Sequence, residues 1–287
     1  MHIIPYLLLL LSISLETGKN VFSNNFSKSV LKNETDIYKF NFLMYTGSFF
    51  ILLFFGGWKG SLFSVILAFI FAMALWLNQY FFLKALKVGS VSFTNFIQCS
   101  SLIIPIIFAT VVWKDKITFL QIVLIAVLIF SLIPTLNIGK ERLNIKWLLY
   151  SFAAMLALGV IGIIQAFHQS SLHSGELVFF LRHAFLFAVI INLLGFSLCR
   201  KREQANFSFK STALVQAAAS GAFMGGVHML NLYLAGKLPY VVLFPTLNGG
   251  LIFLTLICDL FIFKERLSLK QWIGIIIGTL ALCLIDL

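Results

Sequence analysis

Lys114-Asp115-Lys116-Ile117-Thr118-Phe119 recurs 150 residues later as Lys264-Glu265-Arg266-Leu267-Ser268-Leu269. Held at that shift, the stretch 83–136 aligns with a second copy without gaps. Each copy has an apolar run, a short basic break, a long apolar run, the charged turn and a final apolar run. This pattern predicts an internal duplication, with one repeat at 1–137 and the other at 138–287.

The composition is that of a membrane protein. Of 287 residues, 60% are hydrophobic and only 11% are charged, whereas soluble domains carry about 25% charged residues. The net charge of +11 lies mostly in short breaks between apolar runs, where it can meet anionic lipid head groups. Such scattered basic residues disfavour a nucleic-acid partner. The four cysteines are far apart in the sequence and have neither metal nor redox spacing, so no cofactor is expected.

Apolar segments long enough for membrane helices follow one another along the whole chain. They are 3–26, 38–56, 61–82, 90–113, 117–136, 146–168, 176–199, 211–234, 239–262 and 269–286. The first lacks the basic start and cleavage site of a signal peptide. Because five helices is an odd number, a tandem copy enters the membrane from the opposite side. We therefore predict an all-α polytopic membrane protein with ten transmembrane helices in two inverted five-helix repeats.

The repeat and the second charged turn resemble a known family. In EamA domains of the drug/metabolite transporter superfamily, a Glu-Arg-Leu turn leads into a Gln-x-x-Gly helix start. Glu265-Arg266-Leu267 followed by Gln271 and Gly274 fits this pattern, while the first copy departs from it at Asp115 and Leu124. The resemblance implies two five-helix bundles around a central cavity that opens alternately to each side. It implies little about which solute is moved.

Glu16 is an acidic residue well inside the first apolar segment. A charge at membrane depth costs about 2.5–3.5 kcal/mol on insertion scales, and desolvation favours the neutral acid, a property that proton coupling requires. Pro5-Tyr6 and Glu16 also resemble the first helix of small multidrug resistance proteins, where a glutamate exchanges protons for a cationic drug. The alternative is an internal ion pair with Lys19, three residues further on, with no role in transport.

Uncharged polar residues form a second candidate set, since such groups in membrane helices either line a cavity or bond neighbouring helices. The set is Asn78, Gln79, Asn95, Gln98, Gln165, His168, His228, Asn231 and Asn248. Gln98 and Asn248 are partners at the shift of 150 residues. With Glu16, these residues are the predicted site for substrate or protons. The three histidines at 168, 173 and 183 do not align on one helix face, so no metal site is predicted.

Arg182 is the one arginine well inside an apolar segment. Its guanidinium suits a carboxylate or phosphate of a solute. It also stands near enough to Glu176 in sequence to pair with it, and near enough to the helix start to extend to the membrane interface.

The sequence favours a secondary transporter of a small amino-acid-like, polar or amphipathic solute, working by alternating access. Proton coupling through Glu16 is a separate hypothesis. A non-transporting scaffold or receptor is the alternative. An enzyme is disfavoured, because the chain has neither His-Glu-x-x-His nor Gly-x-Ser-x-Gly. The expected setting is a bacterial cytoplasmic membrane, with lipid, the solute and protons as partners and a monomer or homodimer as assembly.

The orientation in the membrane is open. Fifteen lysines and arginines lie around the odd-numbered turns and four around the even-numbered ones. The positive-inside rule then places the odd-numbered turns in the cytoplasm and both termini outside. The family resemblance implies the opposite orientation.

Overall fold

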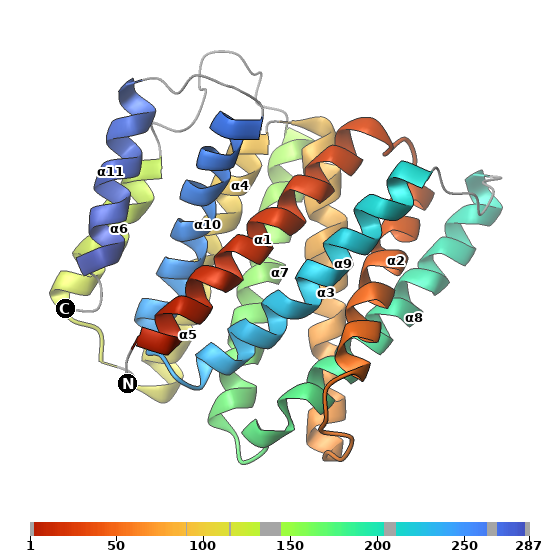
Figure 1. Cartoon of the computed structure of the whole chain (residues 1–287), viewed down its shortest axis with the longest axis horizontal. Coiled ribbons are helices and arrows are strands. Elements are labelled where there is room, and N and C mark those ends of the chain that lie inside the picture. Colours follow the sequence, from red (N-terminus) through yellow and green to blue (C-terminus); the bar gives the residue numbers. More distant parts are fainter. Residues whose placement is uncertain are drawn as a thin grey trace.

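The computed structural model describes residues 3–89, 91–114, 116–132, 145–203, 211–262 and 269–284. Over these ranges the chain is a bundle of helices, and no strand forms (Figure 1). Three predicted features lie outside the described residues: Asp115, the second charged turn at 264–268 and the boundary between the two repeats at 137/138.

The helices follow the predicted apolar segments in order. They are α1 (Ile3–Ser29), α2 (Glu34–Leu53), α3 (Leu62–Val88), α4 (Val91–Cys99), η1 (Ser100–Leu102), α5 (Ile103–Phe108), η2 (Ala109–Trp113), α6 (Phe119–Leu132), α7 (Ile145–Ser170), η4 (Ser174–Glu176), α8 (Leu177–Glu203), α9 (Ser211–Ala235), α10 (Tyr240–Ile262) and α11 (Leu269–Leu284). The pieces from α4 to η2 occupy the single predicted segment 90–113.

Four helical stretches within the described ranges are long and apolar enough to cross a membrane. They are Leu62–Val88, Ile145–Ser170, Ser174–Lys201 and Ser211–Ala235. They support a protein that crosses the membrane several times, whereas the full count of ten crossings stays a prediction.

The second helix begins earlier than the apolar pattern predicts. Its first residue is Glu34, although the apolar run starts near residue 38. The Asp36 carboxylate accepts hydrogen bonds from the backbone N–H groups of Lys32 and Asn33, at 3.0 and 3.1 Å. These bonds fix the turn before the helix, so the polar break is itself the helix start.

The helix at the fourth predicted segment is irregular. A 3₁₀ turn, η1, precedes Pro105 in α5, whose ring nitrogen has no hydrogen for the carbonyl four residues back. Further on, η2 is a π-helix that ends at Lys114 in the left-handed conformation, with φ of 56°. The helix thus changes its hydrogen-bonding pattern twice.

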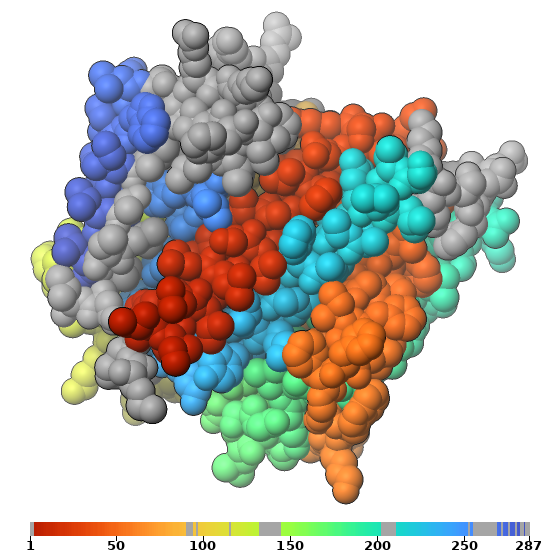
Figure 2. All heavy atoms as spheres, viewed as in Figure 1, coloured from red at the N-terminus to blue at the C-terminus, as the bar shows by residue number. Residues whose placement is uncertain are grey.

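The helices pack mostly with partners distant in sequence. The most extensive contacts between helices join α3 to α7, α1 to α9, and α2 to both α8 and α9. Figures 1 and 2 show α1 and α9 side by side on one face. At one edge of the bundle, α6 packs against α11 (Figure 1).

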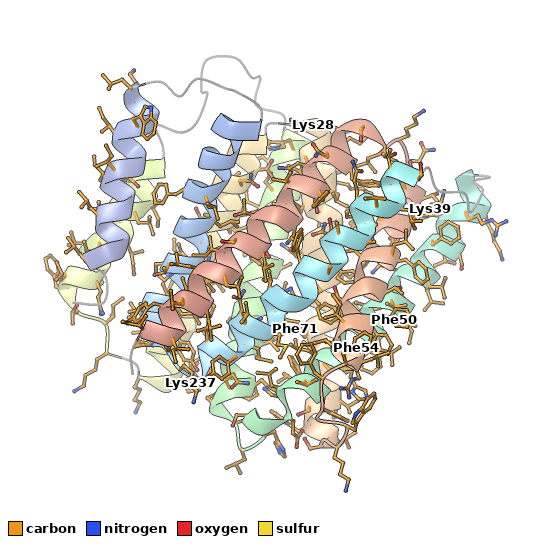
Figure 3. The ribbon with its side chains drawn as sticks, in the orientation of Figure 1. Lys28, Lys39, Phe50, Phe54, Phe71 and Lys237 are labelled. Atoms are coloured by element: carbon orange, nitrogen blue, oxygen red, sulfur yellow. The ribbon has the colours of Figure 1, made fainter. Side chains whose placement is uncertain are left out.

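Large apolar side chains lie both inside the bundle and on its outer surface. Phe71 is fully buried in the largest core cluster, whereas Phe50 and Phe54 point outward (Figure 3). Other exposed apolar residues lie within helices, including Leu10, Ile66, Leu194 and Leu280. An apolar exterior of this extent suits contact with lipid.

Glycine permits the close contact between α2 and α9. A Cβ added to Gly221 would lie 2.3 Å from the backbone oxygen of Met44. The Ser48 hydroxyl donates to the backbone oxygen of Gly221 at 2.8 Å. Gly221 and Gly225 therefore permit the close approach of a second backbone, and α2 is the helix that makes it.

Two charged residues hold the turn between α2 and α3. Arg182 donates to backbone oxygens near the end of α2, and its guanidinium lies 3.8 Å from the centre of the Trp58 ring. The acceptors are Leu52, Phe55, Gly56 and Gly57, at 2.8–3.2 Å. The Glu176 carboxylate accepts from the backbone N–H and the hydroxyl of Ser61, the residue that caps α3. The Arg182 cation thus lies at the C-terminus of α2 and the Glu176 anion at the N-terminus of α3, where the helix dipoles favour these charges.

Candidate functional site

A polar cavity lies at the centre of the bundle, between α1, α3, η1, α5, α7, α9 and α10. This main cavity has a volume of about 90 Å³. Its polar lining is Ser12, Glu16, Lys19, Asn78, Ser101, Gln165, His228, Asn231 and Asn248. Apolar side chains complete the wall, among them Leu75, Leu102, Ile161, Val227 and Phe244.

A smaller side cavity of about 40 Å³ adjoins it. The two share Glu16, Lys19, Asn78, Leu158 and Leu251. The further lining of the side cavity is Asn20, Gln79, Phe82, Asn95, Gln98 and Cys99. The side cavity is therefore an extension of the main one toward α4.

Glu16 and Lys19 form an ion pair at the junction of the two cavities. The Lys19 ammonium lies 2.5 Å from Glu16 Oε1, and the side chains are 8% and 23% exposed, respectively. The internal pair considered from the sequence is thus made. Because both partners also line the cavities, pairing does not remove them from contact with a solute.

Hydrogen bonds between helices fix several of the other polar groups. The Ser12 hydroxyl on α1 donates to Asn231 Oδ1 on α9 at 2.5 Å. The Gln165 amide on α7 donates to His228 Nδ1 on α9 at 3.2 Å. These bonds join helices that would move apart if the cavity opened between them.

The amides of the side cavity are only partly paired. Asn78 Nδ2 donates to Gln98 Oε1 at 3.2 Å and to the backbone oxygen of Ala154 at 2.9 Å. Gln79 Nε2 and Gln98 Nε2 are buried and have no hydrogen-bond partner in the part of the chain that the structure describes. Asn248, the repeat partner of Gln98, instead donates to the backbone oxygen of Phe244 in its own helix, at 2.9 Å.

The structure brings nine of the ten predicted residues to these cavities and places His168 elsewhere. His168 is fully buried against Phe180, with ring centres 4.4 Å apart. Its Nε2 lies 3.5 Å from the Ser64 hydroxyl, and its Nδ1 accepts from Gln169. Among the described residues, no three His, Cys, Asp or Glu side chains are grouped to hold a metal ion.

Four residues of the polar lining were not in the predicted set: Ser12, Asn20, Ser101 and Lys19, which was considered only as an ion-pair partner of Glu16. Serine in a membrane helix often bonds to its own backbone, so its residue type gives little signal. Asn20 stands four residues after Glu16, on the same face of α1, and this spacing could have identified it.

Comparison with known proteins supports the fold and the family. The model of the EamA-like transporter family matches residues 20–136, and no curated protein matches the chain. One solved structure, described only as "Crystal structure of protein", has a TM-score of 0.71 at 10% sequence identity. It covers 96% of this chain and 98% of its own. At that identity the likeness shows the fold alone. The resemblance to EamA domains is therefore confirmed over residues 20–136, the part of the chain that the family model matches.

Proposed function

We propose that the protein is a secondary transporter that moves a small polar or amphipathic solute through the main cavity by alternating access. The observation that supports this function best is the cavity itself. It has polar side chains in its wall, contains a partly buried ion pair and lies between apolar helices. Ionisable groups at such depth are a mark of solute or ion pathways. We further propose the bacterial cytoplasmic membrane as its location and a monomer or homodimer as its assembly.

Helix packing supports the proposal of two inverted repeats. At a shift of about 150 residues, α1 corresponds to α7, α3 to α9, α4 and α5 to α10, and α6 to α11. The contact of α3 with α7 then has its counterpart in α9 with α1, and that of α1 with α10 in α7 with α4 and α5. Contacts of α2 with α8 and of α6 with α11 pair each helix with its own counterpart.

The same correspondence applies to the cavities. Their polar walls come from α1, α3 and α4 in one repeat and from α7, α9 and α10 in the other. A cavity between the two repeats would open toward either side when one repeat rocks against the other. The bonds of Ser12 with Asn231 and of Asn78 with Ala154 cross this interface, so rocking would break or exchange them.

Proton coupling through Glu16 is a separate proposal. A proton bound to the Glu16 carboxylate would neutralise it and weaken its ion pair with Lys19. The Lys19 ammonium would then be free to meet an acceptor group of the solute. Conversely, loss of the proton would restore the pair and favour release of the solute. This exchange would link protonation of Glu16 to occupancy of the cavity.

A thermal-shift screen of the detergent-purified chain tests both proposals. Amino acids, nucleosides, sugars, polyamines and lipophilic cations are compared at pH 5.5 and 8, with wild type beside Glu16→Gln. We expect one class to raise the unfolding temperature of wild type, to do so differently at the two pH values, and to lose this pH difference in the variant. A pH difference retained in Glu16→Gln would exclude Glu16 as the proton site.

Uptake of the solute found in this screen into proteoliposomes then tests transport directly. Counterflow of labelled solute supports a transporter. Binding without any flux would favour a receptor or scaffold instead.

A further inference from the structure

The side cavity contains two buried amide groups whose donors are unused. Gln79 is 1% exposed and Gln98 is 8% exposed. Both line the side cavity, and the Nε2 atom of each is buried without a partner within the described residues. Buried polar groups are nearly always paired, and leaving one unpaired is costly. Two such donors on side chains that line one small space therefore indicate a ligand that accepts hydrogen bonds.

The orientation of the Gln98 amide is fixed by its neighbour. Asn78 Nδ2 is a donor, and it bonds the Gln98 side chain at 3.2 Å. The atom facing Asn78 must therefore be the acceptor Oε1, which leaves Nε2 for the cavity. If Oε1 and Nε2 of Gln98 were exchanged, the Nε2 donor of Gln98 would face the Nδ2 donor of Asn78, and the hydrogen bond would be lost. The unused donor of Gln98 is thus a consequence of the network around it.

The third donor at this cavity is Lys19. Its ammonium has three N–H donors, and the contact with Glu16 at 2.5 Å uses one. Lys19 lines the side cavity together with both glutamines. One cation and two amide donors match an acceptor group with a single negative charge, which is the chemistry of a carboxylate. The Glu16 carboxylate lines the same cavity, and its pairing with Lys19 leaves the two glutamine Nε2 donors as the buried unpaired groups of this lining among the described residues.

The size of the side cavity indicates a subsite rather than a complete site. One water needs roughly 10–15 Å³ by the same measure, so about 40 Å³ holds a group of a few atoms. The rest of the solute would lie in the adjoining main cavity, along apolar side chains such as Leu75, Ile161 and Val227.

We propose that the side cavity is the subsite for a carboxylate group of the solute, bound by Gln79, Gln98 and Lys19, with an apolar body in the main cavity. This inference rests on the proposed transport function and narrows its substrate to small carboxylates. The Asn78 amide holds Gln98 in the binding orientation and is a positioning residue.

Three related probes test the subsite on the purified full chain: leucine, 4-methylpentanoate without the amino group, and 3-methylbutylamine without the carboxylate. We expect leucine and 4-methylpentanoate to raise the unfolding temperature and the amine to have no effect. Gln79→Met removes a donor while keeping the shape, and we expect it to weaken binding of the two carboxylates on the order of tenfold. Without a probe it should be at least as heat-stable as wild type, because no protein bond is lost.

Two further variants separate binding from folding. Gln98→Glu keeps the acceptor for Asn78 but replaces the two donors, so carboxylate binding should fall as in Gln79→Met. Gln216→Met makes the same chemical change at a glutamine that lines neither cavity, and binding should stay at the wild-type value. Equal binding of the amine and the acids, no binding of either acid, or undiminished binding in Gln79→Met would each overturn the subsite.

Flux measurements distinguish this failure from failure of the proposed function. Proteoliposomes that take up 3-methylbutylamine as fast as leucine would show transport without a carboxylate requirement, which overturns the subsite alone. Carboxylates that bind with the predicted dependence on Gln79 but are never transported would support the subsite and contradict the transporter.

Discussion

At the scale of single residues, Arg182 is placed to stabilise one end of the bundle. It is 4% exposed and donates to four backbone oxygens at the end of α2. Lysine keeps the charge but lacks the planar fork that reaches several acceptors at once. We therefore expect Arg182→Lys to reduce stability by roughly 1–3 kcal/mol, measured as a lower midpoint of thermal unfolding in detergent.

The reverse exchange near the same turn is the matched control. Lys59 is exposed, so Lys59→Arg should leave the midpoint unchanged. Wild-type stability in Arg182→Lys would mean that the ammonium of lysine satisfies this end of α2 equally well.

Residue type alone predicted which polar side chains are site candidates, but it did not predict the partners that each side chain contacts. Glu16 and the amides could be selected because polar groups at membrane depth are costly. Gln165 and His168 were equivalent candidates on one helix. Gln165 reaches His228 across the cavity, whereas His168, nearly a turn further on, packs on Phe180. That difference depends on where α8 and α9 pack, and the local sequence pattern does not predict this packing.

At the scale of helices, Gly221 determines how closely α2 and α9 approach. A methyl group there would lie 2.3 Å from the Met44 backbone oxygen, and a backbone cannot move aside as a side-chain tip can. We expect Gly221→Ala to separate the two helices and to reduce stability by roughly 1–3 kcal/mol. Thermal unfolding in detergent measures this loss.

Gly226→Ala is the control on the same helix. There the added Cβ would meet only the end of the Leu15 side chain, at 3.1 Å, which can rotate away. Both variants gain the same helix propensity from alanine. If they have equal stability, the approach of α2 to α9 is not limited at Gly221.

Helix positions were predictable from apolar runs, and their irregularities only in part. Proline removes a helical hydrogen bond, and a 3₁₀ turn does precede Pro105. No residue type in η2 predicts that it forms a π-helix. The start of α2 was predicted too late because Asp36 makes the polar break a helix start.

At the scale of the whole molecule, the repeat is what links sequence to site. The shift of 150 residues paired Gln98 with Asn248 before any contact was known, and both residues line the connected cavities. Their hydrogen bonds nevertheless differ: Gln98 Oε1 accepts from Asn78, whereas Asn248 donates within α10. The predicted duplication gives equivalent positions for these two residues but not their hydrogen bonds, so the asymmetry of the site could be seen only in the structure.

The two ends of the bundle differ in charge, and this difference predicts its orientation in the membrane. Lys28 and Lys39 lie toward the upper end in Figure 3 and Lys237 toward the lower one. In the predicted ten-helix arrangement, the odd-numbered turns, the first of which contains Lys28 and Lys39, have fifteen basic residues in the sequence, and the even-numbered ones, which include Lys237, have four. Because cytoplasmic turns are enriched in lysine and arginine, we expect the upper end to face the cytoplasm.

Labelling of a single introduced cysteine at each end measures this orientation. Lys87 and Lys59 are both exposed and lie at opposite ends of α3, Lys87 in its last turn and Lys59 in the turn before the helix. A membrane-impermeant maleimide should label Lys59→Cys in intact cells and Lys87→Cys only after permeabilisation, relative to the wild-type background from its four cysteines. The reverse pattern would support the orientation that the family resemblance implies. The basic end would then face outward against a bias of fifteen to four, and features other than turn charge would have to determine how the first helix inserts.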